Sequence, residues 1–198
     1  MKIIFVPILI FALGQTAFAG DWPRWRGAGH DDISIETGLL RSWPSGGPKR
    51  LWLSEDIGFG YSTPSVAGGR LFILGTKDGK EHLFTKDLKT GKTQWAIPLN
   101  SRFSNNWGDG PRGAATVDGD RVYALGAKGG LVCVSVVDGK IFWEADLVEG
   151  LGGKVPYWGY SESVLVEGDL VICTPGGSKG TLAALDKRTG KVKWRSSN

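Results

Sequence analysis

Four side chains in this 198-residue sequence could take part in binding or catalysis. They are Asn106, Arg112, Trp158 and Glu162. Arg112 could bind an anionic group, Glu162 could act as a base or a metal ligand, and Trp158 could stack on a planar ring. The alternative is structural: Arg112 and Glu162 would pair with each other, and the aromatic side chains would pack between neighbouring parts of the fold. Further polar and aromatic residues accompany them at Tyr61, Trp107, Asp109 and Tyr160.

The other reactive residue types lack partners at a useful spacing. Cys133 and Cys173 lie in separate apolar, strand-like runs without C-x-x-C spacing, so we expect buried free thiols. A disulfide between them is the alternative. His30 and His82 stand alone, and the sequence contains neither a G-x-S-x-G elbow nor a phosphate-binding loop. We therefore predict no catalytic residue and no metal site.

The charge pattern argues against nucleic acid as a partner. The chain carries 24 Lys and Arg against 20 Asp and Glu, which gives a formal net charge of +4. This excess is small for 198 residues, and it is not gathered into a long basic run. The partner that we expect is a protein or a polymer.

Two markers recur along the chain with one period near 50 residues. The first is a turn glycine, at Gly68, Gly119 and Gly168. The second is a tryptophan, at Trp95, Trp143 and Trp194. The glycines are 51 and 49 residues apart and the tryptophans 48 and 51, so two independent markers define the same three units.

Each unit predicts four short strands joined by glycine-containing turns. Apolar and β-branched runs alternate with Asp-Gly, Gly-Gly and T-G-K or D-G-K turns, which favour antiparallel hairpins. Four antiparallel strands repeated at this period are typical of β-propeller blades. We therefore predict an all-β partial β-propeller with repeats at residues 59–99, 110–147 and 159–196. The functional loops would enter the innermost strands from one mouth of the channel.

The third unit resembles a known tryptophan-docking motif. Residues 184–194 read A-L-D-K-R-T-G-K-V-K-W, which is similar to the A-x-D-x-x-T-G-x-x-x-W motif of pyrroloquinoline-quinone (PQQ)-type propellers. The resemblance implies structural roles for Asp186 and for the turn glycines and tryptophans of the three units. Those residues are Gly91, Gly139, Gly190, Trp95, Trp143 and Trp194. The first unit keeps most of the motif, whereas the second keeps its glycine and tryptophan but has Cys133 and Ser135 at the alanine and aspartate positions.

This resemblance implies two classes of function. The first is a non-catalytic exported module that binds or scaffolds a protein or polymer and needs no cofactor. The second is a fragment of a PQQ-dependent alcohol or polyvinyl-alcohol dehydrogenase, which would use PQQ and calcium. Many enzymes of the family also carry a disulfide between adjacent cysteines, and this chain has no adjacent cysteines.

The N-terminal region predicts export. Lys2, the apolar run at residues 3–13 and the A-F-A sequence at residues 17–19 are typical of a signal peptide, here residues 1–19. The apolar run is too short to span a bilayer. We therefore expect a soluble periplasmic or extracellular protein with no membrane span.

Residues 20–58 form a further N-terminal segment before the first unit. Its D-W-P-R-W-R-G opening at residues 21–27 resembles the start of exported bacterial PQQ-like proteins. Residues 49–53 are a candidate closing strand without the three strands before it, so we expect a loosely held segment. Three units and one orphan strand do not make a ring of four to eight blades. The sequence thus favours a fragment, and closure by several chains is the alternative.

Overall fold

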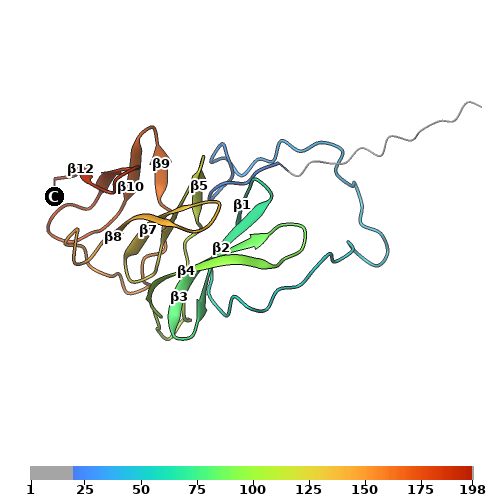
Figure 1. Cartoon of the computed structure of the whole chain (residues 1–198), viewed down its shortest axis with the longest axis horizontal. Coiled ribbons are helices and arrows are strands. Elements are labelled where there is room, and N and C mark those ends of the chain that lie inside the picture. The colour runs from blue at the N-terminus through green and yellow to red at the C-terminus, as the bar shows by residue number, and fades with distance from the viewer. Residues whose placement is uncertain (1–19, 198) are drawn as a thin grey trace, which may run out of the picture.

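The computed structural model describes residues 20–197, and these contain strands, turns and loops but no helix. The predicted signal peptide at residues 1–19 lies outside the described residues. The twelve strands form three separate four-stranded sheets, which follow one another side by side in chain order (Figure 1). We call each sheet a blade. The all-β, partial β-propeller prediction is confirmed.

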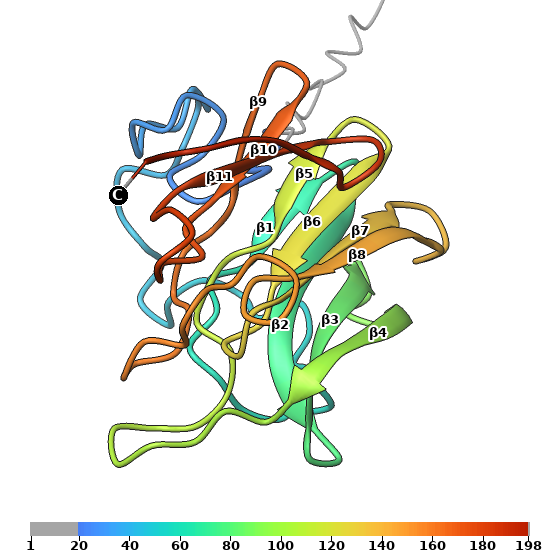
Figure 2. The same cartoon turned by 90° about the vertical axis from the view of Figure 1, so that its left-hand side faces the viewer.

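All strand pairs within each blade are antiparallel, and spatial order follows chain order. Blade 1 contains β1 (Ser65–Ala67), β2 (Arg70–Lys77), β3 (Lys80–Asp87) and β4 (Thr93–Ser101). Blade 2 contains β5 (Thr116–Asp118), β6 (Arg121–Leu125), β7 (Gly130–Ser135) and β8 (Ile141–Asp146) (Figure 2). Blade 3 contains β9 (Leu165–Glu167), β10 (Leu170–Cys173), β11 (Ala183–Asp186) and β12 (Val192–Arg195).

The hydrophobic core consists of two layers between consecutive blades. Phe72 and Leu83 of blade 1 belong to one buried cluster with Val122 of blade 2. Tyr123 and Leu131 of blade 2 belong to a second cluster that extends into blade 3. The middle strands of blade 2 are apolar along most of their length because blades 1 and 3 cover them on both faces.

Three tryptophans each pack on a turn glycine of the blade that follows them in the chain. The pairs are Trp52 on Gly91, Trp95 on Gly139 and Trp143 on Gly190. A Cβ atom at any of these glycines would lie only 2.6–2.8 Å from the indole ring. The indole N–H of Trp143 also donates to the carbonyl oxygen of Lys187 at 3.0 Å. Ring contact between blades therefore fixes the spacing of consecutive sheets.

Residues 49–53 do not form the strand that the sequence suggested. No described strand lies beside them to supply ladder hydrogen bonds, yet Trp52 still docks on Gly91 and donates to the Leu88 carbonyl at 2.9 Å. At the other end of the segment, Trp22 exchanges two backbone hydrogen bonds with Val66 of β1. The segment is therefore anchored to blade 1 through Trp22 and Trp52, and Asp56 adds an ion pair with the buried Lys86 of β3.

One face of the molecule collects the longer connections. β2 and β4 run in the same direction, so the chain leaves both strands on one side of the blade. The same geometry in blade 2 brings residues 57–64, 102–115 and 147–164 to one side. We call this side the loop face.

Candidate functional site

All four candidate residues lie in connections of the loop face. Asn106 and Arg112 belong to the β4–β5 connection, and Trp158 and Glu162 belong to the β8–β9 connection. The two connections touch, because the backbone of Glu162 lies against Gly113. The fold therefore gathers these residues around neighbouring loops, where a ligand could reach more than one of them.

Arg112 holds its own loop in shape. Its guanidinium donates hydrogen bonds to the backbone carbonyl oxygens of Gly108, at 2.8 Å, and Gly110. The same group lies 4.8 Å from the ring centroid of Phe103 and 5.6 Å from that of Tyr61. These contacts give Arg112 a structural task, because they occupy its planar fork and its flat faces.

Glu162 is engaged with the backbone of its own blade. Its Oε1 atom accepts a hydrogen bond from the backbone N–H of Thr174 at 2.7 Å. Arg112 and Glu162 make no ion pair with each other among the described residues. The structural alternative that paired them is therefore wrong, although each of them stabilises a loop by itself.

A buried carboxylate that the sequence did not single out joins two blades beneath this face. Glu81 of β3 is fully buried, and its two oxygens accept from the backbone N–H groups of Phe103 at 3.2 Å and Ala127 at 2.7 Å. Burial raises the pKa of the Glu81 carboxyl, and these hydrogen bonds partly oppose that rise. Glu81 thus ties the β4–β5 connection of blade 1 to the β6–β7 turn of blade 2.

Four aromatic side chains form an exposed surface on the loop face, which we call the aromatic ledge. Its members are Tyr61, Trp107, Tyr157 and Trp158, with exposed fractions from 47% to 68%. The Trp107 and Trp158 rings lie 5.3 Å apart at 57°, and the Tyr157 and Trp158 rings lie 5.0 Å apart at 84°. A cluster of exposed aromatic rings at one place is a feature of interaction surfaces.

Polar contacts between loops hold the aromatic ledge in place. The Asn105 side chain accepts from the Trp107 backbone N–H at 2.9 Å and donates to the Tyr157 carbonyl at 3.1 Å. Tyr61 packs on Gly108, where an added Cβ would lie 2.2 Å from the phenol oxygen. The loops of consecutive blades therefore support each other, so the rings are positioned before any ligand arrives.

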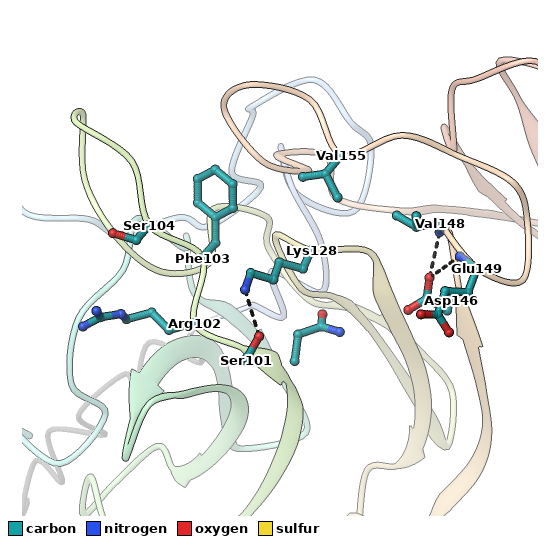
Figure 3. Close-up of a pocket in the computed structure, with 10 residues that line it drawn as sticks. Ser101, Arg102, Phe103, Ser104, Lys128, Asp146, Val148, Glu149 and Val155 are labelled. Atoms are coloured by element: carbon teal, nitrogen blue, oxygen red, sulfur yellow. Dashed lines mark hydrogen bonds between the residues drawn. The ribbon is translucent and has the colours of Figure 1, made fainter.

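A groove of about 550 Å³ opens on the loop face between blades 1 and 2 (Figure 3). On one side, Lys128 donates to the Ser101 hydroxyl at 2.9 Å. On the other, Asp146 accepts from the backbone N–H groups of Val148 and Glu149. The groove thus places the cations Arg102 and Lys128 toward one wall and the carboxylates Asp146 and Glu149 toward the other, and Phe103 lies beside the cations.

The two thiols are free and buried, as the sequence predicts. Burial raises the pKa of the Cys133 thiol and raises that of Cys173 to about 12. A thiol must ionise to act as a nucleophile or a metal ligand. Both cysteines therefore serve as small apolar core residues at neutral pH.

The described residues of the loop face do not by themselves assemble a calcium ligand set. Calcium takes about six or more oxygen ligands. Within residues 20–197, no group of three or more His, Cys, Asp or Glu side chains could hold a metal ion. Glu162 already accepts from Thr174, and Arg112, the candidate for an anionic cofactor, already binds two carbonyl oxygens.

The amino-acid sequence is similar to a known protein family and to a larger enzyme. The family model of outer membrane protein assembly factor BamB matches residues 80–198. Lupanine 17-hydroxylase [cytochrome c] of Pseudomonas sp is 29% identical over 204 residues, covering 92% of this chain but 27% of that protein. The chain thus spans about a quarter of that relative's length.

Solved structures support the fold. A europium-containing methanol dehydrogenase superposes with a TM-score of 0.53 at 18% identity, covering 73% of this chain and 26% of that one. Quinohemoprotein alcohol dehydrogenase from Comamonas testosteroni gives 0.53 at 20% identity, covering 72% of this chain and 21% of that one. These likenesses establish the propeller architecture shared with quinoprotein dehydrogenases.

Proposed function

The chain belongs to the family of outer membrane protein assembly factor BamB, and we propose that it is an exported, non-catalytic binding or scaffold module of the PQQ-like β-propeller type. The module would work in the periplasm or outside the cell, with a protein or a polymer as its partner. None of the described residues forms a helix able to cross a membrane.

The exposed and pre-positioned aromatic ledge is the observation that carries this proposal. Trp107 is 68% exposed, although its backbone is held by Asn105 and its ring lies against Trp158. Leaving large rings in water is unfavourable, and Trp and Tyr dominate the binding energy of many protein interfaces. By contrast, the charged candidates Arg112 and Glu162 are engaged in holding backbone groups.

A second candidate function follows from one observation. The similarity to lupanine 17-hydroxylase extends over 92% of this chain, which favours a segment of a larger PQQ-dependent dehydrogenase. In that case PQQ and calcium would belong to the whole protein. Asn106, Arg112, Trp158 and Glu162 would then be the residues of this segment that lie nearest to the cofactor.

Calcium-dependent retention of PQQ separates the two functions. We would dialyse the full chain against PQQ with either calcium or a chelator, and repeat this with Glu162→Gln, which keeps the size of the side chain. The non-catalytic module predicts equal retention with calcium and with chelator. Retention that needs calcium and is lost in Glu162→Gln would overturn the proposal and favour the dehydrogenase segment.

A further inference from the structure

A second sequence repeat places one aromatic residue per blade on the loop face. An aromatic-glycine pair occurs at Phe59-Gly60, Trp107-Gly108 and Trp158-Gly159, each time 36 residues before the docking tryptophan of the same blade. Phe59, Trp107 and Trp158 are exposed by 48%, 68% and 47%. The repeat therefore carries two aromatic positions: the first is exposed in all three blades, and the second packs on a turn of the next blade in blades 1 and 2.

The backbone beside these rings is already occupied. The carbonyl of Phe59 accepts from Thr76, that of Gly108 from Arg112 and that of Tyr157 from Asn105. A partner strand that adds to a sheet edge needs free backbone donors and acceptors. This part of the loop face therefore recognises its ligand through side chains.

The rings are tilted against one another and carry free donors. Trp158 meets Trp107 at 57° and Tyr157 at 84°, so the three rings do not share one flat plane. Within residues 20–197, the indole N–H groups of Trp107 and Trp158 and the amide of Asn106 make no hydrogen bond. An angled apolar surface edged by donors suits a ligand with compact apolar rings and unpaired carbonyl groups.

We infer that the aromatic ledge binds a proline-rich segment of a partner protein in the polyproline II conformation. Such a segment has no internal hydrogen bonds, leaves its carbonyls free as acceptors and loses little conformational entropy on binding, because it is already extended. Proline rings would pack against the exposed rings of Trp107 and Trp158, and the indole N–H groups would donate to the carbonyls between them. This inference rests on the proposed function and specifies the chemistry of its partner.

The test is binding of fluorescein-labelled decaproline to the full chain, followed by fluorescence anisotropy. We expect saturable binding that Trp107→Ala and Trp158→Ala each weaken about tenfold, in the range of an interface hot spot. Trp43→Ala is the matched control, because Trp43 is 69% exposed but lies outside the loop face, in the N-terminal segment. Trp107→Phe keeps a ring but removes the indole N–H, so it should weaken binding less than Trp107→Ala.

Thermal unfolding of each variant separates lost binding from lost folding. Trp107 and Trp158 are exposed, so their replacement should leave Tm near that of the parent chain. Absence of decaproline binding, or equal binding by the parent and both alanine variants, would overturn the inference. Binding of cellohexaose in place of decaproline would also overturn it and make the ledge a glycan surface. If decaproline does not bind while PQQ retention stays independent of calcium, the proline-rich ligand is wrong but the proposal of a non-catalytic module is retained.

Discussion

Gly91, Gly139 and Gly190 each meet two requirements: a positive backbone φ and close packing against a tryptophan ring. Gly139 has φ of +71°, a left-handed conformation that costs other residues about 1–2 kcal/mol. It also leaves room for the Trp95 ring, since a Cβ atom there would lie 2.8 Å from the indole. Glycine is therefore needed both for the backbone of the turn and for the contact with the preceding blade.

Replacing glycines with and without a tryptophan contact should separate these two requirements. Gly119 also has positive φ, +60°, but an added Cβ would meet nothing within 4 Å. We expect Gly119→Ala to lower the free energy of unfolding by about 1–2 kcal/mol. Gly139→Ala should cost clearly more, because Trp95 must move. Denaturant unfolding measures both changes, and equal losses would contradict ring docking at this turn.

Asp186 stabilises its turn in a way that depends on pH. The Thr189 hydroxyl donates to its carboxylate at 3.0 Å, and Lys193 lies 3.2 Å away. The Thr189 hydrogen bond, followed by that of Lys193, lowers the pKa of Asp186 from its ordinary value of 3.8 to about 2. A lowered carboxyl pKa gives stability that is present above the unfolded-state value and is lost as pH falls through the folded-state value.

Asp186→Asn should therefore lose a pH-dependent part of this stability. We expect the variant to have a lower Tm than the parent above pH 4, and the difference to shrink as pH falls toward 2. Differential scanning calorimetry across this range measures the effect. A Tm difference that grows on acidification would show that the charge of Asp186 does not support the turn.

At the scale of elements, consecutive blades are held together by the tryptophans of their outer strands. Trp143 of β8 is 8% exposed and packs on the Gly190 turn of blade 3. Trp194 occupies the matching position of β12 but is 42% exposed. The same residue type therefore stands in two environments within one molecule.

Trp143→Ala should cost about 3–5 kcal/mol of unfolding free energy, the usual range for removal of a buried tryptophan. Trp194→Ala should cost clearly less, because much of its ring is already in water. Chemical denaturation of both variants tests this difference. Similar small losses would mean that tryptophan docking does not hold blades 2 and 3 together.

The sequence predicts the blades well because each turn has a local sequence signal. Glycine pairs and the T-G-K turns mark where strands end, and the period near 50 residues identifies the sheets. Glu81 could not be predicted in the same way: it lies between Lys80 and His82 in a polar stretch. It is buried only because the backbone N–H groups of Phe103 and Ala127, distant in sequence, meet its carboxylate.

The candidate site was predicted in position but not in detail. The loops that carry Asn106, Arg112, Trp158 and Glu162 were expected at one mouth, and the strand order brings them to one face. The partners of Arg112 and Glu162 are backbone groups, which leave no signature in residue types.

At the scale of the whole molecule, the N-terminal segment covers a surface on which a second chain would have to pack in order to close a ring. Closure by several chains would require Trp194 of one copy to pack on the Gly91 turn of another. In this structure Trp52 already lies over Gly91, and its indole N–H donates to Leu88. The described contacts therefore favour closure of that blade edge by the chain's own segment.

The loop face is consequently the surface on which the proposed function depends. There, the aromatic ledge and the groove between blades 1 and 2 are open, while Glu81 and Arg112 fix the loops from beneath. In the proposed binding module, the charged groups support the backbone and the aromatic groups face solvent.

Dye-linked oxidation of alcohols by the full chain, supplied with PQQ and calcium, tests the central claim most directly. Primary alcohols and polyvinyl alcohol would be the substrates, with PQQ and calcium alone as the blank. We expect no turnover above the blank, because the described residues do not assemble a calcium ligand set and the charged candidates hold backbone groups. Turnover that requires both PQQ and calcium, and that falls in Glu162→Gln, would contradict a non-catalytic binding module.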